Sequence, residues 1–128
     1  FRGKVLVVDD DALVLTLTQT RLEGAGFTVV TRDKAIGTLQ AIHEERPDVV
    51  MLDIRMPALT GTSLADLITR TKGGVPIIFH SSQNLTALQV AAQHGGAIGA
   101  ISKTPDDALF LRQFDRLYER IKRRALIK

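Results

Sequence analysis

The chain has 128 residues, of which 45% are hydrophobic and 24% are charged, so its length suits one domain and its composition argues against disorder. No apolar run approaches the roughly 20 residues that span a bilayer, and no cysteine is present to form a disulfide or a thiolate metal site. The formal net charge of +3 divides unevenly: residues 112–128 carry +5, from seven basic and two acidic side chains, and residues 1–111 carry −2. Because this basic excess is confined to one terminal helix, we expect a solvated helix face and no direct binding of nucleic acid.

The first part of the chain predicts two strands, each followed by a helix. The apolar run 5–8 is typical of a strand buried on both faces, and a helix over about 12–23 follows it and ends near Gly24 and Gly26. The run 27–31 is more mixed, which favours an edge strand. The helix after it is indicated by apolar residues at helical spacing, namely Ala35, Leu39 and Ile42.

Three further apolar runs, at 49–52, 77–79 and 97–101, predict three more buried strands. Apolar residues at helical spacing follow each run. They are Leu64, Leu67 and Ile68 after the first, Leu85, Leu88 and Ala92 (with Asn84 as a candidate N-cap) after the second, and Phe110, Phe114, Leu117, Tyr118 and Ile121 after the third.

The start of the last helix has its own signature, the sequence Thr104-Pro105-Asp106-Asp107. It predicts a capping hydroxyl, a proline in the first helical position, and two acids that face the positive end of the helix. This places the expected start of the helix at Pro105.

Strand and helix therefore alternate five times, which predicts an α/β fold with a parallel sheet, right-handed crossovers and helices on both faces. With 27–31 at the edge, the expected architecture is a flavodoxin-like (βα)5 three-layer sandwich of strand order 2-1-3-4-5. Because the chain begins with Phe1 and not with Met, we expect residues 1–128 to be a single domain excised from a longer protein. In such a sheet the functional site lies at the carboxyl ends of the first and third strands.

Acidic residues follow both of these strands: Asp9, Asp10 and Asp11 come after the first, and Asp53 ends the third. An acid after a strand is often only a helix N-cap, and Asp11 fits that role. Several carboxylates at one point of the sheet repel one another unless a cation neutralises them. Oxygen ligands without cysteine or a nearby histidine favour a hard cation, and Mg²⁺ is the natural choice.

Polar groups also follow the last two strands, where Ser81 and Ser82 end one and Ser102 and Lys103 end the other. A hydroxyl, an ammonium and a metal around one carboxylate are suited to phosphoryl transfer. The two cations offset the repulsion between an anionic donor and an anionic nucleophile.

These motifs make the chain similar, along its whole length, to the receiver domains of two-component response regulators. The motifs are Val7-Val8-Asp9-Asp10, Met51-Leu52-Asp53-Ile54-Arg55-Met56-Pro57 followed by Gly61, Pro76-Ile77-Ile78-Phe79-His80-Ser81-Ser82, and Ser102-Lys103. The segment from Leu52 to Pro57 with Gly61 is the specific part, whereas an acidic pair or a single lysine is weak evidence.

The resemblance implies a role for each site residue. Asp53 accepts a phosphoryl group from a phosphohistidine, and Lys103 contacts the phosphoryl oxygens. Ser81 swings toward them and shifts the region after the fourth strand. Mg²⁺ is held by Asp10, by Asp53 and by the backbone carbonyl of Arg55, and Asp9 holds it through a water.

The resemblance also implies the cellular role. We expect a cytoplasmic signalling domain that is not an independent enzyme, with a sensor histidine kinase or phosphotransfer protein and an output domain or protein as its partners. No membrane contact is expected, and a homodimer is left open.

Two positions depart from the family pattern. The aromatic residue that usually stands three positions before the lysine is replaced by Ala100, and Thr104 intervenes between Lys103 and Pro105, where the proline usually follows directly. His80 stands where an apolar residue is typical, and strand alternation directs it away from Ser81. We therefore assign His80 no catalytic role.

Two alternatives remain open from the sequence. A pseudo-receiver would act only as a protein-docking module. A haloacid-dehalogenase-like phosphatase would use Asp9 and Asp11 as its nucleophile and acid, but it leaves the segment from Asp53 to Gly61 unexplained.

Overall fold

The computed structural model of the chain describes residues 2–56, 60–71, 74–82 and 97–127. Its five strands are β1 (Lys4–Val8), β2 (Thr28–Arg32), β3 (Val49–Asp53), β4 (Ile77–Ser81) and β5 (Gly99–Ser102). The helices in these residues are α1 (Ala12–Gly24), α2 (Thr38–Glu45), α3 (Gly61–Thr71) and α5 (Asp107–Ile127). The helix expected around 85–92, with its cap at Asn84, lies outside the described residues.

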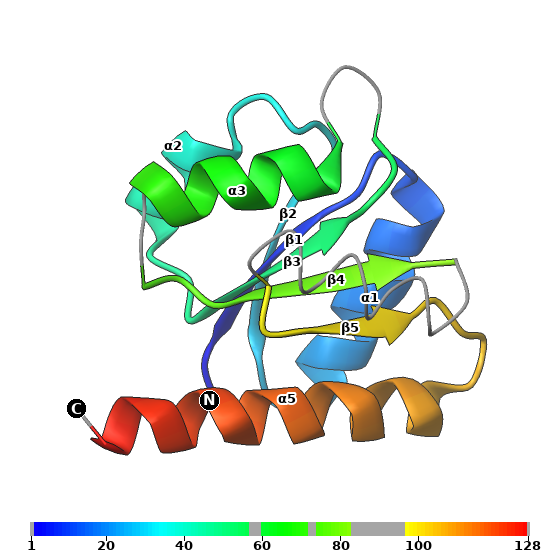
Figure 1. Cartoon of the computed structure of the whole chain (residues 1–128). Helices are drawn as coiled ribbons and strands as arrows, with labels where there is room; N and C mark the ends of the chain where they lie inside the picture. Colours follow the sequence, from blue (N-terminus) through cyan, green and yellow to red (C-terminus); the bar gives the residue numbers. More distant parts are fainter. Residues whose placement is uncertain (1, 57–59, 72–73, 83–96, 128) are drawn as a thin grey trace.

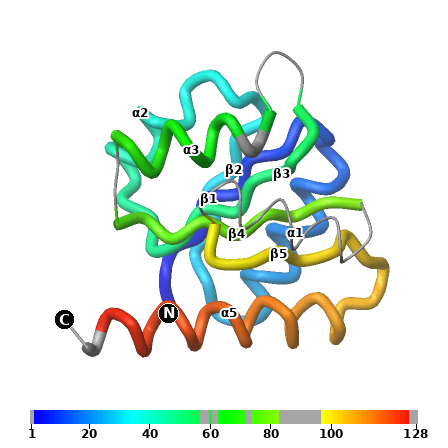
Figure 2. Tube along the Cα trace, viewed as in Figure 1, coloured from blue at the N-terminus to red at the C-terminus, as the bar shows by residue number. Residues whose placement is uncertain are grey.

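All neighbouring strands pair in parallel, in the order β2-β1-β3-β4-β5, so the expected α/β architecture is confirmed. The helices form a layer on each side of the sheet: α2 and α3 cover one face, and α1 and α5 cover the other (Figure 1). The trace in Figure 2 shows that α5 runs past the end of the sheet toward the C-terminus.

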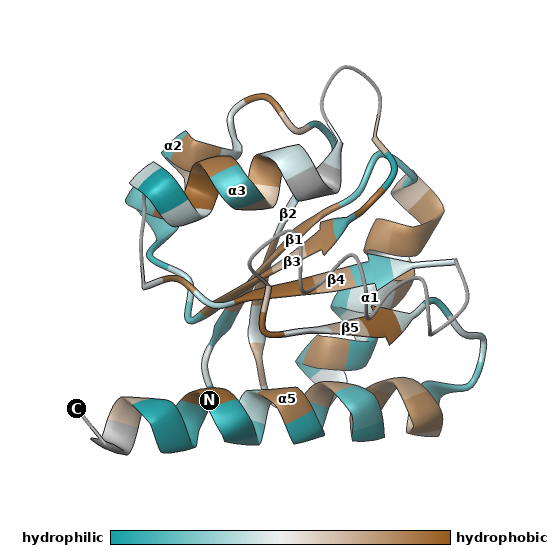
Figure 3. Cartoon of the chain, in the orientation of Figure 1, coloured by the Kyte–Doolittle hydropathy of each residue, from teal (hydrophilic) through white to brown (hydrophobic). Residues whose placement is uncertain are grey.

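The burial of the strands follows their apolar sequences. Every residue of β3 and β4 is buried, whereas β2 and β5 contain half-buried positions, as expected at the two edges of a sheet. Apolar side chains of the strands pack alternately toward the two helical layers, which gives one core under α2 and α3 and another under α1 and α5. Figure 3 shows these strands as the most hydrophobic part of the chain.

The start of α5 differs from the sequence prediction by two residues. The helix begins at Asp107, and the carboxylate of Asp106 caps it by accepting the N–H of Leu109 at 3.1 Å. The hydroxyl of Thr104 instead accepts the N–H of Asp106 at 3.1 Å, which forms a turn that leaves Pro105 outside the helix. Both residue types cap helices well, and here the acid takes the cap because the threonine is used in the preceding turn.

An ion pair between a buried arginine and an exposed aspartate joins α1 to α5. The Nε atom of Arg21 lies 2.6 Å from an oxygen of Asp107, and the Arg21 guanidinium lies 5.2 Å from the ring centroid of Phe110. The Arg21 side chain is only 4% exposed, but that of Asp107 is 72% exposed. The two residues are 86 positions apart, so the pair fixes the relative position of the two helices on their face of the sheet.

Candidate functional site

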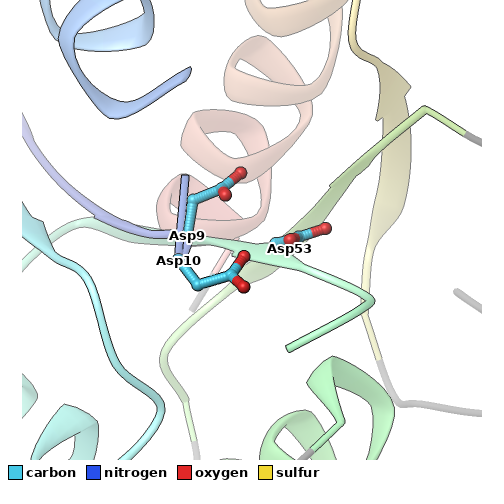
Figure 4. Close-up of side chains that lie close together, drawn as sticks. All are labelled: Asp9, Asp10 and Asp53. Carbon is cyan, nitrogen blue, oxygen red and sulfur yellow. The ribbon is translucent and has the colours of Figure 1, made fainter. Parts of the chain in front are cut away.

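Three carboxylates meet at the carboxyl edge of the sheet. Asp9 and Asp10 follow β1, Asp53 ends β3, and these two strands pair with each other. Figure 4 shows the three side chains beside one another. One oxygen from each lies within 4.8 Å of the others, so the residues expected from the sequence to share a site do so. Asp9 and Asp53 are buried and Asp10 is exposed, which leaves the cluster open to solvent on one side.

Backbone N–H groups hold the two buried carboxylates in place. An oxygen of Asp9 accepts the N–H of Asp11 at 2.9 Å, and an oxygen of Asp53 accepts the N–H of Arg55 at 3.3 Å. Asp11 itself caps α1, because its carboxylate accepts the N–H groups of Leu13 and Val14. The N-cap interpretation of Asp11 is therefore confirmed, and its carboxylate is not part of the cluster.

Lys103 brings a positive charge to the cluster from the end of β5. Its Nζ atom lies 2.9 Å from an oxygen of Asp9 and 3.4 Å from an oxygen of Asp53. Its own backbone N–H donates to the carbonyl of Ser81 at 2.8 Å, which joins the ends of β4 and β5. The threonine inserted after Lys103 therefore does not prevent the ammonium from reaching the acids.

The charges at this edge are not balanced by the side chains alone. Burial raises the pKa of Asp53 and the charge of Asp9 raises it further, and these effects outweigh the opposing influence of Lys103 and of the Arg55 N–H. Burial lowers the pKa of Lys103, but its hydrogen bond and charge interaction with Asp9, together with the charge of Asp53, outweigh the burial, so the pKa is raised. The Lys103 ammonium contacts two of the three acids, Asp9 and Asp53, and a further cation would relieve the excess negative charge.

The acid cluster fits a hard divalent cation, because it offers several carboxylate oxygens in a partly buried place that remains open to water. Asp10 and Asp53 would provide direct ligands, and the backbone carbonyl of Arg55 follows Asp53 on the same loop. The cluster could therefore hold a metal ion, and its donor set suits Mg²⁺ better than a softer metal.

Ser81 on β4 and Ala100 on β5 are the two positions that the sequence analysis linked to a conformational change on phosphorylation. Ser81 is buried at the end of β4, and its neighbour in the sheet register is Ser102. Ala100 lies beside Phe79 and packs against the core under α2 and α3. No aromatic side chain stands at position 100, so the packing on this part of β5 is made by a methyl group.

His80 is a packing residue whose side chain lies on the opposite face of β4 from that of Ser81, in the core under α1 and α5. It is buried, its ring lies edge-on to Phe110 at a centroid distance of 5.6 Å, and neither ring nitrogen has a hydrogen-bond partner among the described residues. Burial, together with the charges of Lys103 and Arg21, lowers the pKa of His80 to about 3, so the ring is neutral.

Comparison with known proteins identifies the family. The family model described as "Response regulator receiver domain" matches residues 5–114. The chain belongs to this family. The matched residues include β2 to β5, nearly all of β1, and the acids Asp9, Asp10 and Asp53.

Proteins similar to this receiver domain include named regulators. Over 87 residues it is 45% identical to "Probable transcriptional regulator ycf27" of Guillardia theta, covering 68% of this chain and 32% of that protein. Over 105 residues it is 33% identical to the DNA-binding transcriptional regulator NtrC of Escherichia coli, covering 82% of this chain and 22% of that protein. The chain thus spans about a third or less of these two relatives.

Solved structures show the same fold. A response regulator receiver domain protein from Clostridium thermocellum has 23% identity and a TM-score of 0.82, with 98% of this chain and 99% of that chain covered. NtrX from Brucella abortus has 26% identity and a TM-score of 0.88, with 99% of this chain but 29% of that chain covered. The same fold therefore makes up nearly all of the first solved chain and less than a third of the second.

The structure adds Arg21 to the residues that sequence reasoning had singled out. Nothing in the local pattern marks it, since an arginine in a helix is usually exposed.

Of the helices in the described part of the chain, none has both the length and the apolarity needed to cross a membrane.

Proposed function

We propose that this chain is a phosphorylation-dependent switch in which Asp53 accepts a phosphoryl group from the phosphohistidine of a partner kinase. The observation that carries the proposal is the position of Asp53, which is beside Asp9 and Asp10 and within 3.4 Å of the Lys103 ammonium. A carboxylate nucleophile surrounded by acids and one cation is suited to phosphoryl transfer once a metal has joined it.

The metal we propose is Mg²⁺, held by Asp10, Asp53 and the backbone carbonyl of Arg55, with Asp9 binding through a water. When bound, it neutralises charge on the phosphoryl oxygens and on the nearby carboxylates. Lys103 is the second cation: it now contacts Asp9 and Asp53, and it would turn to an oxygen of the incoming phosphoryl group. Asp53 is buried and held by the Arg55 N–H, which limits the directions from which its free oxygen can attack.

In the transfer step an oxygen of Asp53 forms a bond to phosphorus while the bond between phosphorus and the histidine nitrogen breaks. The electron pair of that bond stays on the imidazole, and the product on this chain is an acyl phosphate. The reaction needs no residue of this chain as an acid or base, because the departing imidazole takes its proton from water. The chain assists its own phosphorylation and is not an independent enzyme.

The conformational response we propose involves Ser81 and the region that follows β4. The Ser81 hydroxyl would turn toward the phosphoryl oxygens, which favours one of two arrangements of that region. The backbone N–H of Lys103 donates to the carbonyl of Ser81, so a hydrogen bond directly joins the two residues that would respond to the phosphoryl group. With Ala100 in place of an aromatic residue, the response depends on other contacts of β5.

We further propose a cytoplasmic domain of a longer protein, with a sensor histidine kinase or phosphotransfer protein upstream and an output domain or protein downstream. The names of the relatives support this, since NtrC is called a DNA-binding transcriptional regulator and covers a longer chain. Regulation of DNA then belongs to the part of such a protein outside the receiver domain.

The test is incubation with acetyl phosphate and Mg²⁺, followed by intact-mass spectrometry. We expect a gain of one phosphoryl group in the wild type and in Asp11→Asn, and no gain in Asp53→Asn. Loss of phosphorylation in Asp11→Asn with retention in Asp53→Asn would instead favour the phosphatase alternative.

A second measurement separates a switch from a docking module. Beryllofluoride with Mg²⁺ should shift the amide resonances of both Asp53 and Ser81 if the site is coupled to the end of β4. Shifts confined to the neighbourhood of Asp53 would contradict the switch and favour a domain that only docks.

A further inference from the structure

The basic residues near the C-terminus form a defined row along α5. Four arginines stand at four-residue intervals, all four are exposed, and none forms an ion pair with an acid of the described residues. They are Arg112, Arg116, Arg120 and Arg124, here called the arginine row. Residues four apart lie side by side on a helix, so the row is continuous and roughly 18 Å long.

The arginine row is not neutralised by the acids of its own helix. Asp107 pairs with Arg21, and Asp115 pairs with Arg2 at 3.0 Å. Glu119 is the remaining acid of α5. Like charges at four-residue spacing destabilise a helix, and an arginine cannot lose its charge by deprotonation at neutral pH. The row is therefore a surface that would gain from an anionic partner.

A pocket adjoins the C-terminal end of the arginine row. Its volume is about 540 Å³, which is within the range of about 300–1,000 Å³ common for binding pockets. It lies between the second half of α5 and the segments that precede β3, β4 and β5, and is here called the basal pocket. Its walls are largely apolar and include Val75, Pro76, Ile77, Ile98 and Ile121.

The arginine row and the basal pocket form one continuous surface. Arg124 belongs to both, because it ends the row and also lines the pocket. Arg120 donates to the carbonyl of Ile98 at 3.5 Å, and Ile98 is itself a pocket residue. In Figure 1 this part of α5 projects beyond the sheet, and Figure 3 shows its outer side as hydrophilic.

We propose that this surface binds an acidic amphipathic helix of a protein partner. Carboxylates one helical turn apart repeat at the same interval as the arginine row, so each can meet a guanidinium in a planar, two-bonded contact. An apolar side chain of the same segment fills the basal pocket and anchors it.

Other partners fit this surface less well. A symmetric contact with a second copy would place one arginine row against another, and like charges disfavour that arrangement. Nucleic acid would satisfy the arginines but has no apolar group for the basal pocket beside them, and the row has no aromatic side chain for stacking. A small anion would reach only a fraction of the row.

This inference goes beyond the phosphorylation switch, since the two surfaces lie at opposite edges of the sheet. The acids and Lys103 follow the strands, whereas the pocket residues Val75, Pro76 and Ile98 precede β4 and β5. A partner bound here leaves Asp53 accessible to a kinase. Binding is therefore expected with and without a phosphoryl group on the domain.

The experiment measures fluorescence anisotropy of a labelled helical peptide with Glu at every fourth position and Leu on the adjoining face. The comparison peptide carries Gln in place of each Glu, and a DNA duplex of mixed sequence is a further probe. We expect the wild-type protein to bind the Glu peptide, to bind the Gln peptide at least about fivefold more weakly, and to bind the duplex more weakly than the Glu peptide.

Two pairs of variants test the two parts of the surface. Arg116→Gln/Arg120→Gln should weaken binding of the Glu peptide about fivefold, whereas the charge-matched Lys34→Gln/Arg70→Gln should not. Ala125→Glu places a negative charge at the basal pocket and should weaken binding, whereas Gln40→Glu, which adds the same charge at an exposed position of α2 on the other face of the sheet, should leave it unchanged. Circular dichroism confirms that each variant is folded.

The proposal is overturned if the wild type fails to bind the Glu peptide, or if the Gln peptide binds equally well. It is also overturned if Arg116→Gln/Arg120→Gln binds like its control. Tighter binding of the duplex than of the Glu peptide would assign the surface to nucleic acid instead.

Discussion

The ion pair between α1 and α5 leads to an asymmetric prediction, because its two members differ in exposure. Asp107→Ala removes the partner of a guanidinium that is only 4% exposed and leaves the Arg21 charge buried. Loss of one member of a fully buried pair costs about 3–5 kcal/mol. Since Asp107 is 72% exposed, water can partly reach the broken contact, and we expect a loss of about 2 kcal/mol in the free energy of unfolding.

Arg21→Met makes the opposite change. The mutation removes the buried charge, retains an apolar chain against Phe110, and leaves Asp107 hydrated in the first turn of α5, where a carboxylate is favourable. The lost ion pair and the lost cation–π contact are offset by the removal of a desolvated charge, so the expected loss is about 1 kcal/mol or less.

The assay is urea denaturation followed by far-ultraviolet circular dichroism, on both single variants and the double variant. In the Arg21→Met background, Asp107→Ala should cost only its helix-dipole share of roughly 0.3–1 kcal/mol. Equal losses in the two single variants, or a larger loss in Arg21→Met than in Asp107→Ala, would show that burial of the guanidinium is not the dominant cost.

Three further predictions concern the site and β4. Asp53→Asn should raise the free energy of unfolding in magnesium-free buffer at neutral pH. The folded state raises the pKa of Asp53, so the ionised carboxylate opposes folding in the wild type. The stability gained by Asp53→Asn should therefore vanish as the pH falls below 3.8, the ordinary pKa of the acid. Thermal unfolding of both proteins across this pH range measures the difference. Lys103→Met should lower stability without Mg²⁺ and increase the stabilisation that added Mg²⁺ provides, because the acids lose their ammonium; equal responses of both proteins to Mg²⁺ in a thermal-shift series would contradict this. His80→Leu should remove part of the acid sensitivity. The folded state lowers the pKa of His80 from 6.5 to about 3, so the wild type loses up to ~1.4 kcal/mol per pH unit below the upper value, and a variant whose stability follows the wild-type pH curve would refute the assignment.

Much of the fold could be predicted because its determinants are local in sequence. Each strand is a short apolar run between polar segments, and the more mixed run at 27–31 correctly indicated that β2 is an edge strand. Given parallel strands, the geometry of the sheet then brings Asp9, Asp10, Asp53 and Lys103 to one edge, so the sequence alone predicts that these residues lie together.

The details that sequence reasoning missed depend on competition or on distant contacts. Thr104 and Asp106 are both good caps, and only the turn that consumes the threonine hydroxyl decides that α5 begins at Asp107. The pairing of Arg21 with Asp107 spans 86 positions, and it requires the packing of α1 beside α5, which no local pattern encodes. The basal pocket likewise results from how α5 extends past the sheet and has no motif of its own.

The hydrogen bond from the backbone N–H of Lys103 to the carbonyl of Ser81 affects which side-chain substitutions the domain can accept at these two positions. Since the bond uses only main-chain atoms, a substitution of either side chain removes a chemical group but leaves the mechanical link between the last two strands in place. In the proposed switch, natural variation of these two side chains would therefore change the response to a phosphoryl group while this main-chain bond between β4 and β5 stays in place.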